Sequence, residues 1–170
     1  MLVKELEMKF DPKTIEHLGV KMYSTLPPAL AELISNAYDA DAGNVKVRFV
    51  TVGSRKSITV KDDGHGMSAE DIQQKFLVIG RNRREKDGDK PTSRFGRFAT
   101  GKKGLGKLAL FGLAKSITVD TIRDGKRNRF SLNWNDLLSS EGVYKPAWGI
   151  VERPTGLPNG TTIKLAELKR

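Results

Sequence analysis

Five segments in which apolar and polar residues alternate limit the fold of this chain more than any other feature of its sequence. Short turn sequences separate two pairs of these segments, Gly53-Ser54 in one pair and Asp124-Gly125 in the other, which is typical of antiparallel β-hairpins. The expected strands are Val45–Val52, Ser57–Asp62, Ser116–Arg123, Arg127–Trp134 and Thr161–Ala166. Irregular structure is expected over Asn135–Pro158, because Gly and Pro recur there.

Helical patterns are concentrated in the first two thirds of the chain. The clearest begins at Pro27-Pro28 and reaches Ala42, where Gly43 ends it. Further helices are expected over Pro12–Leu18, from Ser68 to about Leu77, and from near Gly104 through Leu110. Helices gathered in one part of the chain and strands around them favour one helical layer on one sheet. The predicted fold class is therefore α/β, a two-layer α/β sandwich.

The composition excludes several kinds of site and compartment. The 170 residues contain no cysteine, which excludes disulfides, thiolate metal sites and a cysteine nucleophile, and their two histidines are too few for a histidine-based metal site. A chain of this length is typical of one domain with a single core. No apolar run is long enough for a membrane span, and the N-terminus lacks the apolar core of a signal peptide. We expect a cytoplasmic protein without a membrane partner.

Positive charge is concentrated in one segment of the chain. The formal net charge is +10, and the segment from Arg81 to Lys107 contains ten basic and three acidic residues. A localised excess of positive charge indicates an anionic ligand, either phosphate groups or nucleic acid. A solvated loop would have the same composition. Its length and lack of periodicity are typical of a functional or disordered loop.

The helix that begins at Pro27 carries the first set of candidate functional residues. Glu32, Asn36 and Asp39 fall within about 60° of one another on a helical projection, and no Lys or Arg on that face could pair with them. An acid–amide–acid group of this kind suits a hard cation with its water and a general base. A solvated polar side of an ordinary amphipathic helix is the alternative. The apolar face is expected to contain Leu30, Leu33, Ile34, Ala37 and Tyr38.

Three further motifs contain glycine or threonine beside polar groups. Asp62-Asp63-Gly64-His65-Gly66-Met67 follows a strand, and its glycines let the backbone approach a ligand closely. Gly101-Lys102-Lys103-Gly104-Leu105-Gly106-Lys107 precedes a helix, where free backbone amides can bind an anion. Asn159-Gly160-Thr161-Thr162-Ile163 turns into the last strand. Each motif alone also fits an ordinary turn or loop.

The four motifs occur in one order at plausible separations, so together they are far more specific than any one of them alone. Together, AELISNAYDA, DDGHGM, GKKGLGKLA and GTTI resemble the four motifs of the ATPases grouped as gyrase, heat-shock chaperone, histidine kinase and MutL. The match extends from about Leu26 to Leu165 and looks most like the MORC, heat-shock-chaperone and MutL branch. The resemblance implies the Bergerat nucleotide-binding fold, with a mixed, mostly antiparallel sheet and helices on one face. It also implies the cofactors ATP and Mg²⁺.

The resemblance implies a role for each matching position. Glu32 would be the catalytic general base, Asn36 would bind Mg²⁺, and Asp62 would accept a hydrogen bond from the adenine amino group. A lid over about residues 80–103 would close over ATP. The other nucleotide-binding positions would be Asp39, Gly64, Gly66, Met67, Gly101, Lys102, Lys103, Gly104, Leu105, Gly106, Lys107 and Thr161.

The function implied in this way is Mg-dependent ATP hydrolysis coupled to lid closure and to formation of a homodimer. Residues 1–170 would form one such domain in the N-terminal part of a longer protein, and alone it is expected to be weak or inactive in ATP hydrolysis. A module that senses nucleotide without hydrolysis is one alternative, although it would have no need of Glu32. A nucleic-acid-binding domain acting through residues 81–107 is another, although Phe95 and Phe98 are the only stacking aromatics in that segment and no nucleic-acid motif occurs there. DNA or a protein client remains open as a partner.

Overall fold

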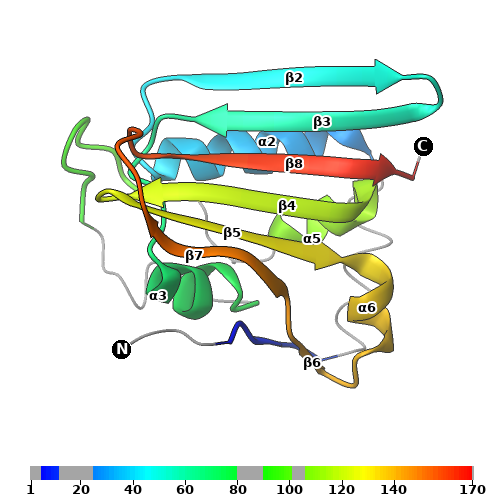
Figure 1. Ribbon diagram of the computed structural model, residues 1–170. Coiled ribbons are helices and arrows are strands. Elements are labelled where there is room, and N and C mark those ends of the chain that lie inside the picture. Colours follow the sequence, from blue (N-terminus) through cyan, green and yellow to red (C-terminus); the bar gives the residue numbers. More distant parts are fainter. Residues whose placement is uncertain (1–4, 12–24, 80–89, 101–105, 170) are drawn as a thin grey trace.

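The computed structural model describes residues 5–11, 25–79, 90–100 and 106–169, which form a sheet with helices packed on one face (Figure 1). Six strands lie in the order β2-β3-β8-β4-β5-β7, and all paired neighbours are antiparallel. The architecture confirms the predicted two-layer α/β sandwich. The strands are β2 (Val45–Val52), β3 (Arg55–Asp62), β4 (Ala114–Arg123), β5 (Lys126–Asn133), β7 (Ala147–Pro154) and β8 (Gly160–Leu168). A separate pair contains β1 (Met8–Lys9) and β6 (Val143–Tyr144).

Helix α2 (Leu26–Asp39) starts one residue before the predicted position and ends earlier than expected. The predicted end at Ala42 is wrong, because Asp41 adopts a left-handed backbone conformation with φ of 62°. The amide of Asp41 then donates to the carbonyl of Tyr38, and the amide of Ala42 donates to that of Ala37. These two bonds form the Schellman ending of a helix, which usually places glycine where Asp41 stands.

The second helix begins where its sequence signal indicated, whereas the predicted start of the third, near Gly104, lies outside the described residues. Helix α3 (Ala69–Asp71) has a capping box, in which the Ser68 and Asp71 side chains each bind the other residue's backbone amide. It continues as a π-helical turn, η1 (Ile72–Phe76). Helix α5 is described over Gly106–Leu113. The predicted helix over Pro12–Leu18 lies outside the described residues.

The irregular structure predicted over Asn135–Pro158 is wrong. Trp134, expected at the end of a strand, instead begins α6 (Trp134–Ser139). The Asn133 side chain starts this helix by accepting hydrogen bonds from the amides of Asn135 and Asp136. Most of the remaining segment forms β6 and β7. The pairing of β7 with β5 shifts register between Arg127 and Phe130, so the alternation of residues within β7 does not predict this strand.

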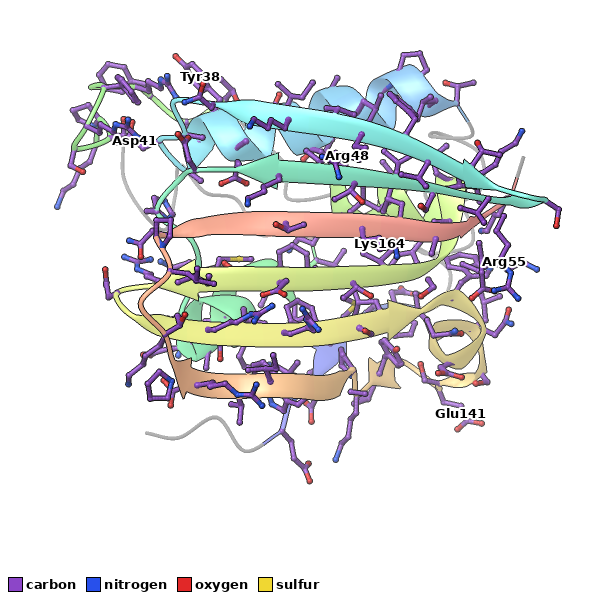
Figure 2. The ribbon with its side chains drawn as sticks, turned by 45° about the horizontal axis from the view of Figure 1, so that its top comes forward. Tyr38, Asp41, Arg48, Arg55, Glu141 and Lys164 are labelled. Atoms are coloured by element: carbon purple, nitrogen blue, oxygen red, sulfur yellow. The ribbon has the colours of Figure 1, made fainter. Side chains whose placement is uncertain are left out.

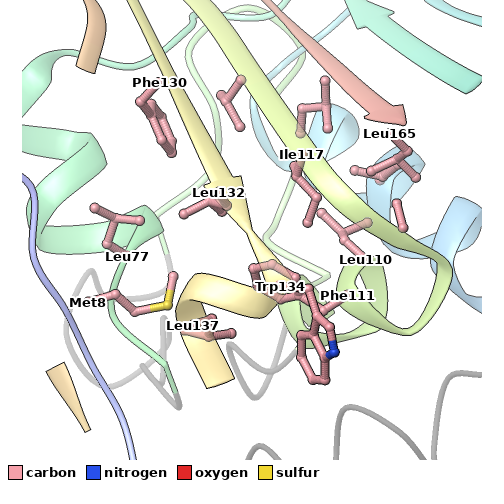
Figure 3. Packing of buried hydrophobic residues seen from close by; sticks show 14 of the residues in the cluster. Met8, Leu77, Leu110, Phe111, Ile117, Phe130, Leu132, Trp134, Leu137 and Leu165 are labelled. Atoms are coloured by element: carbon pink, nitrogen blue, oxygen red, sulfur yellow. The ribbon is translucent and has the colours of Figure 1, made fainter. Parts of the chain in front are cut away.

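The core lies between the sheet and the helices (Figure 3). Phe111 and Trp134 rings lie 5.5 Å apart, and Phe130 contacts both Phe76 and Trp148 edge to face. Such aromatic pairs are favourable beyond the area they bury. The largest fully buried side chains come from seven different elements and the chain between them: Leu6, Met8, Ile72, Leu77, Phe111, Ile117, Phe130, Leu132, Leu137 and Leu165.

The buried stripe of α2 is narrower than its sequence indicated. Ala29, Leu33 and Ala37, spaced four residues apart, are buried, whereas Ile34 and Tyr38 are 45% and 40% exposed. The prediction that Ile34 and Tyr38 lie on the buried face is therefore wrong. Each follows a buried residue by about 100° of helical rotation, which carries its side chain outside the contact.

In the described part of the chain, no helix combines the length and apolar character needed to cross a membrane.

Candidate functional site

A cavity of about 300 Å³ opens on the helix side of the sheet, at the lower end of the range for small-molecule sites. Its wall combines α2, the adjoining ends of β3 and β8, the start of α5 and parts of residues 90–100. Segments far apart in the sequence therefore meet around one space. The predicted site residues that line it are Glu32, Asn36, Asp39, Asp62, Gly66, Met67, Gly106, Lys107 and Thr161.

Asp62 is the last residue of β3 and points to the helix side of the sheet. It pairs in register with Thr161 on β8, and the amide of Gly64 donates to Asp62 Oδ1 over 2.9 Å. Burial raises the pKa of this carboxyl, although hydrogen bonds from the amides of Gly64 and Thr161 act in the opposite direction. The result is a partly desolvated carboxylate that is fixed by backbone donors and faces the cavity.

The chain after Asp62 can turn beside the cavity because of glycine. Gly66 has φ of 69°, and a Cβ there would overlap the carbonyl oxygen of Ile122. Gly64 does not line the cavity, but it lies buried against Ala40 and holds Asp62 through its amide. Gly66 therefore lines the cavity itself, whereas Gly64 contributes only by holding Asp62 in place.

Two threonines form a buried pair behind Asp62. Thr121 on β4 lies opposite Thr161 on β8, and their hydroxyl oxygens are 2.9 Å apart. The Thr121 hydroxyl also accepts a hydrogen bond from the amide of Met67 over 2.9 Å. Sequence reasoning missed Thr121, which is fully buried. A signal was present, since Ile117 and Val119 alternate toward the core and the next inward position is a polar residue.

Glu32 and Asn36 project into the cavity from α2, where both are half-buried. The Glu32 carboxylate lies directly over Gly106 at the start of α5, because a Cβ on Gly106 would overlap it. No donor among the described residues binds that carboxylate, so its oxygens remain available in the cavity. Glycine at position 106 is thus a steric requirement for the position of Glu32.

A short strap, residues 92–97, packs against the end of α2 and is held by Asp41. The Asp41 carboxylate accepts hydrogen bonds from Thr92 Oγ1 over 2.7 Å, from the amide of Arg94 over 2.6 Å and from the amide of Phe95 over 3.2 Å. Burial alone would raise the pKa of Asp41, but these bonds and the charge of Arg97 outweigh it and lower the pKa. Sequence reasoning missed Asp41, and no local signal marks it.

Arg97 secures the other end of the strap. Its guanidinium lies 4.5 Å from the ring centre of Tyr38 and donates to the carbonyl oxygen of Ala42 over 2.6 Å. Asp39 accepts two hydrogen bonds from Thr100, from the amide and from the hydroxyl. The described part of the predicted lid, residues 90–100, is therefore tied to the end of α2. Residues 80–89 of that lid lie outside the described part of the chain.

Lys107 lines the cavity, and its ammonium group donates to backbone carbonyls at the end of η1. These belong to Lys75 at 3.0 Å, to Phe76, and to Val78 at 2.6 Å. Lys107 thereby joins α5 to the segment that follows η1. The other residues predicted in this motif, Gly101, Lys102, Lys103, Gly104 and Leu105, lie outside the described residues.

The donor set fits a magnesium nucleotide. Asn36 offers an amide oxygen, and Asp39 lies on the same side of α2. Mg²⁺ usually takes one or two protein ligands and completes its shell with phosphate oxygens and water. No cluster of three or more His, Cys, Asp or Glu able to hold a metal occurs among the described residues. A site built on one amide and on phosphate needs no such cluster.

Comparison with known proteins agrees with this geometry. Residues 23–147 match the family described as "Histidine kinase-, DNA gyrase B-, and HSP90-like ATPase". A Herpetosiphon aurantiacus protein named "Putative type II restriction enzyme HgiDII" is 34% identical over 167 residues, which cover 96% of this chain and 26% of that protein.

Two other relatives belong to branches that the motifs indicated. "ATPase morc-1" of Caenorhabditis elegans is 30% identical over 97 residues, which cover 57% of this chain and 10% of that protein. "Chaperone protein HtpG" of Nitrosomonas eutropha is 27% identical over 161 residues, covering 84% and 25% respectively. The chain spans about a quarter or less of the length of these three relatives. The family match over most of the chain and the observed fold confirm the resemblance: this chain belongs to the histidine kinase-, DNA gyrase B- and HSP90-like ATPases.

Proposed function

We propose that this domain binds ATP with Mg²⁺ in the cavity and hydrolyses it with Glu32 as general base. The observation that carries the proposal is the convergence of Glu32 and Asn36 from α2 with Asp62 from β3 on one cavity of about 300 Å³. Membership of an ATPase family supports a nucleotide as the ligand.

Asp62 and the threonine pair define the end of the cavity that suits the base. The amides of Gly64 and Thr161 use only part of the acceptor capacity of the Asp62 carboxylate, which can still accept a hydrogen bond from an exocyclic amine such as that of adenine. Guanine presents a carbonyl oxygen at the equivalent position, and two acceptors repel. Thr161 lines the cavity beside Asp62 and supplies a hydroxyl for a bridging water. The pocket therefore favours ATP over GTP.

Glu32 and Asn36 define the other end, where the phosphates would lie. Asn36 would hold Mg²⁺, which supplies positive charge that offsets the phosphate charges. The Glu32 carboxylate is unoccupied by described donors and lies one helical turn from Asn36, which suits it to orient a water and take up its proton. We further propose that residues 80–103 close over bound ATP and that closure favours a homodimer.

Calorimetry and phosphate release together test the proposal. We expect wild-type protein to bind ATP in the presence of Mg²⁺ more tightly than GTP. Glu32→Ala should bind ATP within a few-fold of wild type and lose about 10²–10⁴-fold in phosphate release, the usual cost of losing a general base. Asn36→Ala should lose Mg-dependent affinity as well. Absence of ATP binding in the wild type would refute the proposal.

The alternative of a nucleotide-sensing module makes a different prediction for the same proteins. In that case wild type and Glu32→Ala would bind ATP equally and show the same background phosphate release. Dimer formation can be followed in the same samples by light scattering with a non-hydrolysable ATP analogue. A monomer at all nucleotide concentrations would contradict the coupling to dimerisation without affecting the binding proposal.

A further inference from the structure

The register of three strands places basic and hydroxyl side chains in two rows on the face of the sheet opposite the helices, from which Arg48 and Lys164 are labelled in Figure 2. Residues that pair directly across antiparallel strands point to the same face, and neighbours along a strand point to opposite faces. Ile58, Val60 and Ile163 are buried on the helix side, so the residues between them point outward. The two rows read Arg48–Thr59–Lys164 and Lys46–Lys61–Thr162 from β2 through β3 to β8.

The four cations of these rows, Lys46, Arg48, Lys61 and Lys164, are called the basic face below. All four are exposed, and the structure shows no ion pair to any of them among the described residues. Lys46 and Lys61 pair directly with each other, an arrangement that destabilises a sheet in the absence of an anion. The sheet therefore has two like charges side by side at a position where a pair of opposite charges would stabilise it.

No acidic residue within the two rows offsets this charge. The nearest acid in register is Asp120 on β4, which lies beside Thr162. Its carboxylate already binds Arg127 and Arg129, at distances of 2.6 Å and 2.5 Å. The positive surface thus continues from the basic face to two arginines that surround one carboxylate.

We propose that the basic face binds the sugar-phosphate backbone of duplex nucleic acid. Strands lie about 4.8 Å apart, so Arg48 and Lys164 stand roughly 10 Å apart with the Thr59 hydroxyl between them. Lysine, arginine and threonine side chains are the usual donors to phosphate oxygens. The rows contain neither aromatic side chains for stacking on bases nor Asn or Gln for reading them. Contacts to phosphate oxygens carry no sequence information, so binding of this kind is independent of sequence.

A membrane surface is the other anionic structure that such a face could meet. Interfacial binding buries apolar side chains in the lipid, and the two rows carry none beyond the methyl groups of threonine. The basic face is also separate from the cavity, which opens on the helix side of the same sheet. Nucleic acid on one side and a small ligand on the other can be bound at the same time.

Fluorescence anisotropy with a labelled 20-base-pair duplex of mixed sequence tests the proposal, using chain 1–170 without nucleotide. The variant is Lys61→Gln with Lys164→Gln. The matched control is Lys56→Gln with Lys145→Gln, which removes the same charge. Lys56 lies on β3 like Lys61 but points to the helix side, and Lys145 lies between β6 and β7. Thermal melting and ATP calorimetry show that both variants are folded.

We expect the basic-face variant to bind the duplex at least about tenfold more weakly at 0.1 M salt, and its log–log salt slope to be shallower by about 1.8. The control should stay within about threefold of wild type. Equal binding by wild type and variant would overturn the proposal, as would loss of binding only in Arg83→Gln with Arg84→Gln. Loss of binding to phosphatidylserine vesicles without loss of duplex binding would assign the face to a membrane instead. ATP affinity is measured separately, so failure here leaves the proposed ATP site unaffected.

Discussion

Asp62 and Thr161 face each other across β3 and β8, and both point into the cavity from the ends of their strands. The pairing joins two motifs that lie almost a hundred residues apart in the sequence. Thr161 in turn contacts Thr121 on the next strand, so one partly buried carboxylate and two buried hydroxyls lie side by side. Buried polar groups of this kind stabilise a single arrangement only when their partners are all present.

Replacement of Asp62 by Asn should weaken ATP binding without destabilising the fold. An amide presents an NH₂ group where the carboxylate accepts, so ATP affinity should fall about tenfold to a hundredfold, the cost of a charge-assisted hydrogen bond. Asp63→Asn is the matched control, because the Asp63 carboxylate binds Gly43 and Asn44 and does not line the cavity. Calorimetry that gives the two variants the same ATP affinity would remove Asp62 from the site.

The same variant should be at least as stable as wild type at neutral pH. Burial raises the pKa of Asp62 in the folded state, so the folded protein holds a proton more tightly than the unfolded chain. Stability from this group is therefore present at low pH and is lost as pH rises through the raised pKa. Asp62→Asn removes the titrating group, so the variant does not lose this stability as pH rises. Melting curves of both proteins between pH 4 and 8 should show the difference narrowing as pH falls.

Gly106→Ala should impair catalysis through Glu32. Alanine is the better helix former by about 1 kcal/mol, yet its Cβ would overlap the Glu32 carboxylate. We expect ATP binding within a few-fold of wild type and phosphate release slower by about 10²-fold, because a displaced base loses its geometry. In the Glu32→Ala background the same substitution should have little further effect. Additive losses would mean that Gly106 acts independently of Glu32.

Much of the fold could be predicted because its signals are local. Val45–Val52 alternates from Val45 to Phe49, is rich in β-branched residues and is a strand with the predicted bounds. Ser68 and Asp71 form the capping box that their spacing indicated. Both signals depend on residues within four positions of each other, so tertiary packing has little to override.

The errors arise where distant contacts decide the structure. Strand β7 exists because it pairs with β5 through a shifted register, and nothing in its own alternation shows this. Ile34 is exposed because α2 buries only the stripe through Leu33. In the site, Asp41 was missed because its partners Thr92 and Arg94 lie some fifty residues away. The motif residues that line the cavity could be named in advance, but the groups that position them could not.

Asp71 should make stability sensitive to acid. Burial alone would raise the pKa of Asp71, but Lys75 and Ser68 outweigh it and lower the pKa to about 2. Its carboxylate also binds Arg123 over 2.7 Å. Since the folded-state pKa lies below the unfolded value, this stability, about 2 kcal/mol, is present above pH 4 and is lost as pH falls toward 2. Asp71→Asn should lower the denaturation midpoint at pH 7, whereas exposed Asp124→Asn should not.

Release of the strap should follow from changes at Asp41. A left-handed backbone conformation favours Gly and tolerates Asn, so Asp41→Gly and Asp41→Asn both preserve the end of α2. Gly removes every acceptor for Thr92, Arg94 and Phe95, whereas Asn keeps one oxygen and loses the charge. Amide exchange across residues 92–97 should therefore be fastest in Asp41→Gly, intermediate in Asp41→Asn and slowest in wild type.

The wild-type strap should also respond to pH through the same carboxylate. Its pKa is lowered in the folded state, so protection from exchange should be complete above about pH 4 and should weaken as pH falls through that lowered pKa. Rates corrected for intrinsic exchange, compared with those of α2, isolate the strap from global unfolding. Thr92 and Arg97 line the cavity, so ATP affinity should follow the protection of the strap. It should be highest in wild type, lower in Asp41→Asn and lowest in Asp41→Gly. Unchanged exchange in Asp41→Gly would show that contacts of Arg97 alone hold the strap.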